Sequence, residues 1–279
     1  MGAYHYFRLD NFEADRFVTS NLVAPRTLFF IRLILALYSL AVLAVMFVAN
    51  QERFFNYMTC WSFFGLTIYL CLATYLSGRY SFGIHRYTPE ANPLVTASVA
   101  TQAACWFLYE TFATYHLLVP VVYWSVLYSS FADQPLIQIL ASIGPHATDF
   151  GILVIEVLFN RQQMQLSHWC IPIIVLAFYL GLAYLVWGVQ QIFIYPFLNF
   201  NKLHGWVALI IAGIALGTLI IFTVMYFVHR VRDYLLRRRR AIVVIREKTD
   251  DQYIDAEPAT MLPYHPHNSA PHPCATHIV

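Results

Sequence analysis

Polar side chains follow one face of an otherwise apolar stretch between residues 142 and 160. They recur every three or four positions, the repeat of a single helix face, with one leucine among them: Ser142, His146, Asp149, Leu153, Glu156 and Asn160. Positions on the opposite face, such as Phe150, Val154 and Leu158, are hydrocarbon. Ionisable groups at membrane depth are costly and usually face a cavity or one another, so we expect this face to point inward and to carry function.

If a hydroxyl from another helix lies beside this polar face, the chemistry that the residues favour is acyl transfer. Thr59 begins another apolar stretch, and His146 would remove its proton as the hydroxyl attacks an ester carbonyl. Water would then hydrolyse the acyl-threonine. Asp149, one turn after His146, would orient the imidazole as the third group of a triad, or would simply neutralise it inside a bundle. A threonine in a membrane span more often bonds a carbonyl one turn back, which is the alternative for Thr59.

Three further residues are candidates for the walls of such a site. Glu156 lies ~15 Å beyond His146 along a helix axis, so we expect it to bond a hydroxyl, Gln190 or Gln191 rather than the scissile ester. Trp61 and Tyr195 are candidates for lining the substrate and for holding an oxyanion. Each is equally an aromatic residue of the membrane interface.

The composition is that of an integral membrane protein. Hydrophobic residues make up 59% of the chain and charged residues 11%, and the mean hydropathy is +0.57. The five cysteines are scattered without a CxxC pair, so neither a disulfide framework nor a zinc site is indicated. We predict no cofactor, no metal and no nucleic-acid partner. The polar N-terminus has no features of a removable signal peptide.

The hydropathy pattern predicts an all-α, polytopic membrane protein with a bundle of six transmembrane helices. The expected spans are 27–49, 59–77, 111–131, 137–159, 170–195 and 205–228. Residues 94–110, which include Glu110, are expected to form an interfacial extension, and Arg32 to reach back to the headgroups. Gly213 and Gly217 either form a helix-packing face or are incidental. Residues 1–26 form a lead, 27–229 the transmembrane domain, and 230–279 a basic, then disordered, tail.

Basic residues indicate the orientation. With six spans and the N-terminus inside, the loops on the far side hold only Arg53 and Lys202 of the 17 Lys and Arg residues. This bias places both termini in the cytoplasm. Thr59, His146 and Tyr195 then lie at a similar depth, near the luminal or extracellular boundary, where water and lipid both have access.

Three motifs resemble the androgen-induced transmembrane protein family, in a fungal-type branch. They are the sequence FNYMTCW at 55–61, His146 followed ten positions later by Glu156, and the sequence YPFL at 195–198. The resemblance covers residues 27–229. It implies a threonine hydrolase of fatty acid esters of hydroxy fatty acids, with Thr59 as nucleophile and His146 as its partner, in an endomembrane. Asp149, the long tail and a rewritten loop before span three depart from the animal pattern, which leaves substrate preference open.

Two other classes of function remain. A second resemblance, to rolling-stone-type membrane proteins, implies a non-enzymatic multi-pass protein that binds lipid or organises the cell surface. A solute transporter would use Asp149 and Glu156 as a proton path, although no internal repeat is present. In each case the expected partners are membrane lipids, and for the hydrolase a lipid ester. The compartment is the endoplasmic reticulum or the plasma membrane, and the oligomeric state is open.

Overall fold

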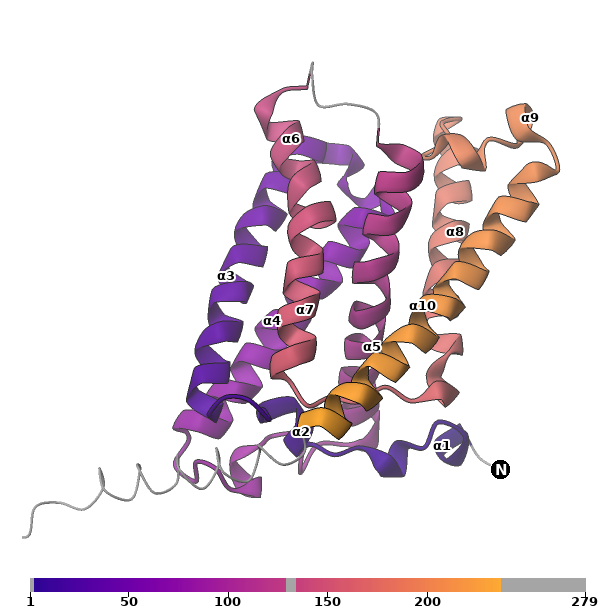
Figure 1. Cartoon of the computed structure of the whole chain (residues 1–279). Coiled ribbons are helices and arrows are strands. Elements are labelled where there is room, and N and C mark those ends of the chain that lie inside the picture. The colour runs from indigo at the N-terminus through magenta and orange to yellow at the C-terminus, as the bar shows by residue number, and fades with distance from the viewer. Residues whose placement is uncertain (1–2, 129–133, 237–279) are drawn as a thin grey trace, which may run out of the picture.

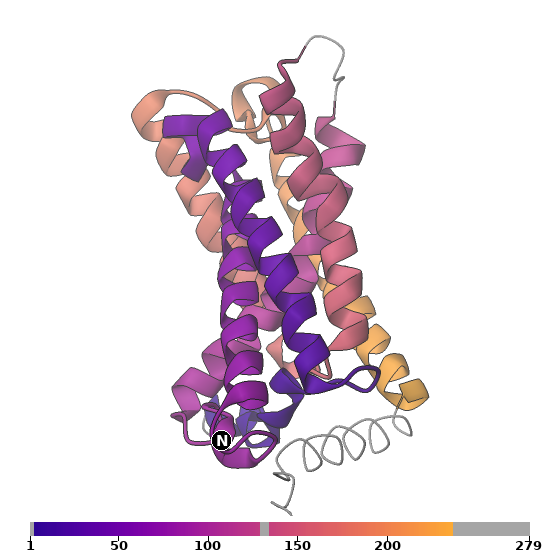
Figure 2. The same cartoon turned by 90° about the vertical axis from the view of Figure 1, so that its left-hand side faces the viewer.

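The computed structural model describes residues 3–128 and 134–236, and every regular element within these ranges is helical. Six long helical segments run up and down beside one another (Figures 1 and 2). They are α3 (Pro25–Asn50), α4 (Met58–Phe82), α5 (Val99–Val122), the continuous α6 (Leu136–Ile143) and α7 (Asp149–Phe159), α8 (Cys170–Gln190), and α10 (Trp206–Leu236). The prediction of an all-α, multi-pass bundle is confirmed.

The bundle has two ends that differ in character. The basal end holds the N-terminal segment with α1 (Ala3–Tyr6) and α2 (Asp15–Val18), together with residues 83–98 and 160–169. The distal end holds residues 51–57 and residues 191–205 with the short α9 (Phe200–Leu203). Both ends of the described chain therefore lie at the basal end (Figure 1).

Five of the six segments are long and apolar enough to cross a membrane, and α5 is the exception. It packs against α4, α7, α8 and α10, and it buries Glu110, Thr114 and His116 among them. A helix surrounded by other helices can carry polar groups that a lipid-facing helix cannot. The number of crossings is thus five by length and composition, and six with α5.

The third span differs from its predicted position. The sequence predicts a span at 111–131, but α5 begins at Val99, where the Ser98 hydroxyl accepts a hydrogen bond from the Thr101 N–H at 3.2 Å. Glu110 therefore lies buried in the middle of a helix, not in an interfacial extension. Pro120 falls in the last turn of α5, and the chain continues into a π-helical turn at Tyr123–Leu127.

The last helix is longer than expected. α10 continues beyond residue 228 to Leu236, because His229, Arg232 and Asp233 are buried against the rest of the basal end. The Arg232 guanidinium donates to the Val157 carbonyl at 2.9 Å and to the Gln162 carbonyl at 2.7 Å. The boundary predicted at residue 229 falls within this helix, and the tail predicted to be disordered lies, from residue 237 on, outside the described residues.

Arg32 is also placed differently. It is completely buried and does not reach the headgroups, because its guanidinium binds the Glu156 carboxylate at 2.9 Å and the Ser77 hydroxyl at 2.7 Å. The Phe17 carbonyl accepts a further hydrogen bond from it at 2.5 Å. An ion pair with saturated hydrogen bonding is the arrangement in which a charge tolerates an apolar interior. The prediction that the polar face of residues 142–160 points inward is confirmed.

The N-terminal segment belongs to the folded domain. Arg16 pairs with Asp233 of α10 at 2.8 Å, and the Arg161 guanidinium donates to the Thr19 hydroxyl at 2.6 Å. Phe17 is buried beside them. The basal end is therefore closed by polar contacts that join the two ends of the described chain to the loop at 160–169.

Candidate functional site

A polar cavity of about 300 Å³ lies at the distal end. Its walls come from the end of α3, the start of α4, α6, and the residues that follow α5 and α8. The side chains around it include those of Asn50, Thr59, Gln138, Ser142, His146 and Tyr195. Three residues that the sequence predicts for one site, Thr59, His146 and Tyr195, thus surround one cavity, although they come from three different segments.

Within the described part of the chain, the Thr59 hydroxyl has no hydrogen-bond partner. Other threonines of α4 donate theirs to the carbonyl one turn back, Thr67 at 3.0 Å and Thr74 at 2.7 Å. Thr59 is the second residue of the helix, and the backbone before it is extended at Tyr57, so no such carbonyl is in place. Among the described residues neither its hydroxyl nor its backbone N–H has a hydrogen-bond partner. This N–H lies in the first turn of α4, where the helix dipole is positive, so both the N–H and the dipole attract a negatively charged oxygen.

His146 lies on a π-helical turn, Gly144–Thr148, between α6 and α7. Its ring stacks on Tyr123 with centroids 3.7 Å apart and an angle of 3° between the planes. The turn is further held because Trp124 Nε1 donates to the His146 carbonyl at 2.7 Å. His146 Nδ1 is buried and has no hydrogen-bond partner within the described part of the chain. The imidazole is thus fixed in orientation, and no described residue occupies its Nδ1.

Tyr195 joins the loop after α8 to the start of α4. Its hydroxyl accepts a hydrogen bond from the N–H of Met58 at 3.1 Å, directly beside Thr59. Burial raises the pKa of Tyr195 to about 12, so the phenol is neutral at physiological pH and keeps its hydrogen. It can therefore donate to an oxygen in the cavity while it accepts from Met58.

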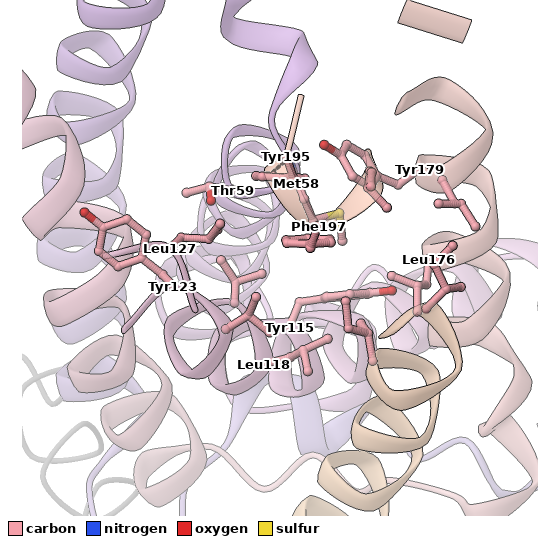
Figure 3. A pocket seen from close by; sticks show the side chains of 16 residues that line it. Met58, Thr59, Tyr115, Leu118, Tyr123, Leu127, Leu176, Tyr179, Tyr195 and Phe197 are labelled. Carbon is pink, nitrogen blue, oxygen red and sulfur yellow. Dashed lines mark hydrogen bonds between the residues drawn. The ribbon is translucent and has the colours of Figure 1, made fainter. Parts of the chain in front are cut away.

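Figure 3 shows an apolar pocket of about 90 Å³, which adjoins the polar cavity. The two share Thr59, Tyr123, Leu127 and Tyr195. The other walls of the pocket are side chains of α5, α8 and α10, together with Met58 of α4 and residues 197–198, and almost all are hydrocarbon or aromatic. Thr59 therefore lies at the boundary between a polar and an apolar space.

Asp149 is not the partner of His146. Its Oδ2 lies 2.5 Å from Nδ1 of His116 on α5, and both side chains are buried. Asp149 therefore neither orients His146 nor neutralises it, and both alternatives predicted from the sequence are wrong. The reason is geometric: α5 lies against α7, and the His116 ring reaches the carboxylate from across the interface.

Glu156 is structural, as its distance from His146 predicts. It pairs with Arg32, and its Oε2 accepts a hydrogen bond from the Tyr69 hydroxyl at 2.7 Å. The expected hydroxyl partner is therefore present. Gln190 and Gln191, the other expected partners, are exposed at the distal end of α8.

Trp61 lies outside the polar cavity. Its Nε1 donates to the Phe55 carbonyl at 2.7 Å, so it is not available to an oxyanion beside Thr59. It lines a third space between α4, α5 and α8, together with His116. Sequence reasoning missed His116, and the signal was a histidine within an apolar run, the same signal that singled out His146.

The described residues contain no group of three His, Cys, Asp or Glu side chains that could hold a metal ion. Comparison with family models, with curated proteins and with solved structures gives no match to this chain. The fold and the site define its class: a helical multi-pass membrane protein with a distal polar cavity beside an apolar pocket.

Proposed function

We propose that this chain is an integral membrane hydrolase of lipid esters, with Thr59 as nucleophile and His146 as general base. One observation carries the proposal: Thr59 borders both the polar cavity that holds His146 and the apolar pocket. A lipid ester needs both environments, because its acyl chain belongs in hydrocarbon while its ester must meet a base and water.

The reaction has two steps. In the first, His146 takes the proton of the Thr59 hydroxyl as the oxygen attacks the ester carbonyl carbon. The tetrahedral intermediate collapses, the alcohol leaves with the proton from His146, and an acyl-threonine remains. In the second, His146 takes a proton from water, which attacks the acyl group. The acid departs, and the proton returns to Thr59.

Two groups suit the developing oxyanion. The unpaired N–H of Thr59 lies at the positive end of α4, and the Tyr195 hydroxyl lies beside it. Donors of this kind, fixed before the substrate arrives, usually give the largest share of stabilisation in acyl transfer. The Thr59 hydroxyl has no competing acceptor among the described residues, which favours its availability as nucleophile.

The substrate class follows from the pocket and from the resemblance to the androgen-induced family. A long-chain ester such as a fatty acid ester of a hydroxy fatty acid would place one chain among α5, α8 and α10. We place the protein in the endoplasmic reticulum or the plasma membrane, with the basal end and both termini cytoplasmic, in line with the bias of basic residues.

Hydrolysis by purified protein tests the proposal. The protein in lipid nanodiscs is given the palmitic acid ester of hydroxystearic acid, and the release of palmitate is followed. Thr59→Ala should abolish release and Thr59→Ser should retain part of it, since a hydroxyl remains. Thr74→Ala removes a hydroxyl from the same helix, away from the site, and is the matched control. Release unchanged in a well-folded Thr59→Ala protein would overturn the assignment.

A further inference from the structure

A third cavity, of about 200 Å³, lies between α4, α5 and α8. It contains neither Thr59 nor His146, and its walls are mostly apolar. Trp61 and Phe178 stand beside it and are 38% and 73% exposed on the outer surface of the bundle. The space is therefore next to the surface that faces lipid. It shares Met58, Tyr115 and Tyr179 with the apolar pocket and no residue with the polar cavity that holds His146.

One strongly polar group faces this space. His116 lines it, and the Nδ1 atom of its ring is bound to Asp149 at 2.5 Å. The other ring nitrogen, Nε2, has no hydrogen-bond partner among the described residues. Asp149 Oδ1 is buried and equally without a partner there. The hydroxyl of Ser62, which also lines the cavity, already donates to the Thr59 carbonyl at 3.0 Å.

Charge neutrality decides what Nε2 can do. If the pair is imidazolium and carboxylate, Nδ1 and Nε2 both carry hydrogens. If it is imidazole and carboxylic acid, the acid donates to Nδ1 and the hydrogen of the ring is on Nε2. Only the form with a net negative charge, a neutral imidazole beside a carboxylate, would leave Nε2 without a hydrogen. An uncompensated charge among apolar helices is costly. In every neutral form, therefore, Nε2–H is a donor without an acceptor among the residues that the structure describes.

The cavity leaves room at the level of this donor. Phe112 stacks on Tyr69 with ring centroids 4.9 Å apart, and His116 is one turn further along α5. Gly65, one turn before Tyr69 on the antiparallel α4, is at that same level and lines the cavity. A Cβ built on Gly65 would meet no atom within 4 Å. The absent side chain keeps a space open opposite the imidazole.

We propose that this cavity is a binding site for a membrane lipid that carries an uncharged oxygen, which accepts a hydrogen bond from Nε2–H of His116. Alcohol and ester or ketone oxygens share this chemistry. A carboxylate would bring a net charge into the apolar interior and is disfavoured. The ligand's hydrocarbon lies against α4 and α8 and extends outward past Trp61 and Phe178.

Photocrosslinking with matched probes tests the site. Four long-chain probes carry the same diazirine and differ only in the terminal group: primary alcohol, methyl ester, carboxylate and methyl. The full-length protein in nanodiscs is labelled at a pH where the acid is ionised, and the labelled peptides are identified by mass spectrometry. The alcohol probe or the ester probe, or both, should label the facing segments of α4 and α8 about tenfold more than the carboxylate and methyl probes do. A tenfold ratio in binding corresponds to one hydrogen bond from a charged or polarised donor. Equal labelling by all four would overturn the proposal.

Variants show whether the label reports this cavity. His116→Leu should remove the preference for the uncharged oxygen, and Gly65→Leu should block labelling by filling the space. Gly213→Leu on α10 adds the same bulk at a glycine with no atom within 4 Å of its added Cβ, outside this cavity, and should leave labelling unchanged. Retained selective labelling in both His116→Leu and Gly65→Leu would refute the site. The alcohol probe, which has no ester bond to hydrolyse, should label Thr59→Ala as it labels wild type, so this outcome is independent of hydrolysis.

Discussion

Arg32 of α3 and Glu156 of α7 form a two-point ion pair in the interior of the bundle. Nε binds Oε1 at 2.9 Å and Nη2 binds Oε2 at 3.1 Å, and neither side chain is more than 1% exposed. The amide of Asn160 also donates to Oε2, at 3.1 Å. This pair ties the first and fourth long segments together toward the basal end, away from the cavity that holds Thr59 and His146.

Removing one member of this pair should severely destabilise the fold. Arg32→Met leaves the Glu156 carboxylate buried without its cation, and Glu156→Leu leaves the guanidinium unpaired. Breaking a buried pair in this way costs about 3–5 kcal/mol. We expect a large loss of thermal stability in detergent for each single variant, measured by the unfolding temperature.

The double variant Arg32→Met/Glu156→Leu is the control. It removes both charges and should recover much of the loss, because apolar residues of similar volume often replace a buried pair without penalty. If the double variant is no more stable than either single variant, the stabilisation by mutual charge compensation is refuted.

The stacking of His146 on Tyr123 should matter for hydrolysis. Tyr123→Leu removes the ring that holds the imidazole, so we expect kcat to fall while membrane abundance is unchanged. Tyr123→Phe keeps the ring and should stay close to wild type. A correctly placed general base contributes about 10²–10⁴-fold, which sets the upper limit of the loss. Equal rates for the Leu and Phe variants would show that the stacking has no role.

Gly144 should tolerate no side chain. A Cβ at this position would come within 2.5 Å of Val42 Cγ1, so Gly144→Ala forces either the Val42 side chain or the contact between α3 and the turn that carries His146 to shift. We expect lower thermal stability and lower activity together. Gly151→Ala on α7 is the matched control, because its Cβ meets no atom within 4 Å. Equal unfolding temperatures for the two variants would contradict the close packing.

The raised pKa of Tyr195 predicts that the stability of the fold depends on pH. Its pKa is raised by burial from 10 to about 12, so between these values the unfolded chain releases the phenolic proton while the folded chain retains it. The contribution of Tyr195 is complete below pH 10 and falls as pH rises toward 12. Wild type should lose stability more steeply than Tyr195→Phe over this range in thermal unfolding. Equal losses of stability in wild type and Tyr195→Phe would refute the contribution of Tyr195.

The orientation predicts which residues react from each side. Arg53→Cys and Lys202→Cys at the distal end should be labelled by an impermeant maleimide from the luminal or extracellular side. Arg8→Cys and His85→Cys at the basal end should be labelled only from the cytoplasmic side. All four positions are exposed. Labelling of a distal and a basal position from the same side would overturn the topology.

Local pattern was enough to predict much of the bundle. Apolar runs of the length of a bilayer, separated by polar breaks, predict where five of the six long segments begin within two residues, because each helix satisfies its own backbone hydrogen bonds. The ends of α4, α8 and α10 differ from the predicted ones by five to eight residues. The three-and-four spacing also predicts that the face from Ser142 to Asn160 is buried. Where the pattern was ambiguous, at α5, the choice of span was wrong, since Glu110 looks unsuitable for a helix interior until its partner His168 is seen at 2.7 Å.

The sequence by itself determined the class of the protein, the course of most helices and which residue types could do chemistry. Only the tertiary structure decided the pairings: Asp149 with His116, Glu156 with Arg32, and Thr59 with His146 around one cavity. Helix formation depends on neighbours along the chain, whereas a buried charge is satisfied by whichever partner the packing of distant helices brings within a few ångströms. That choice is made between helices, and spacing within one helix does not contain it.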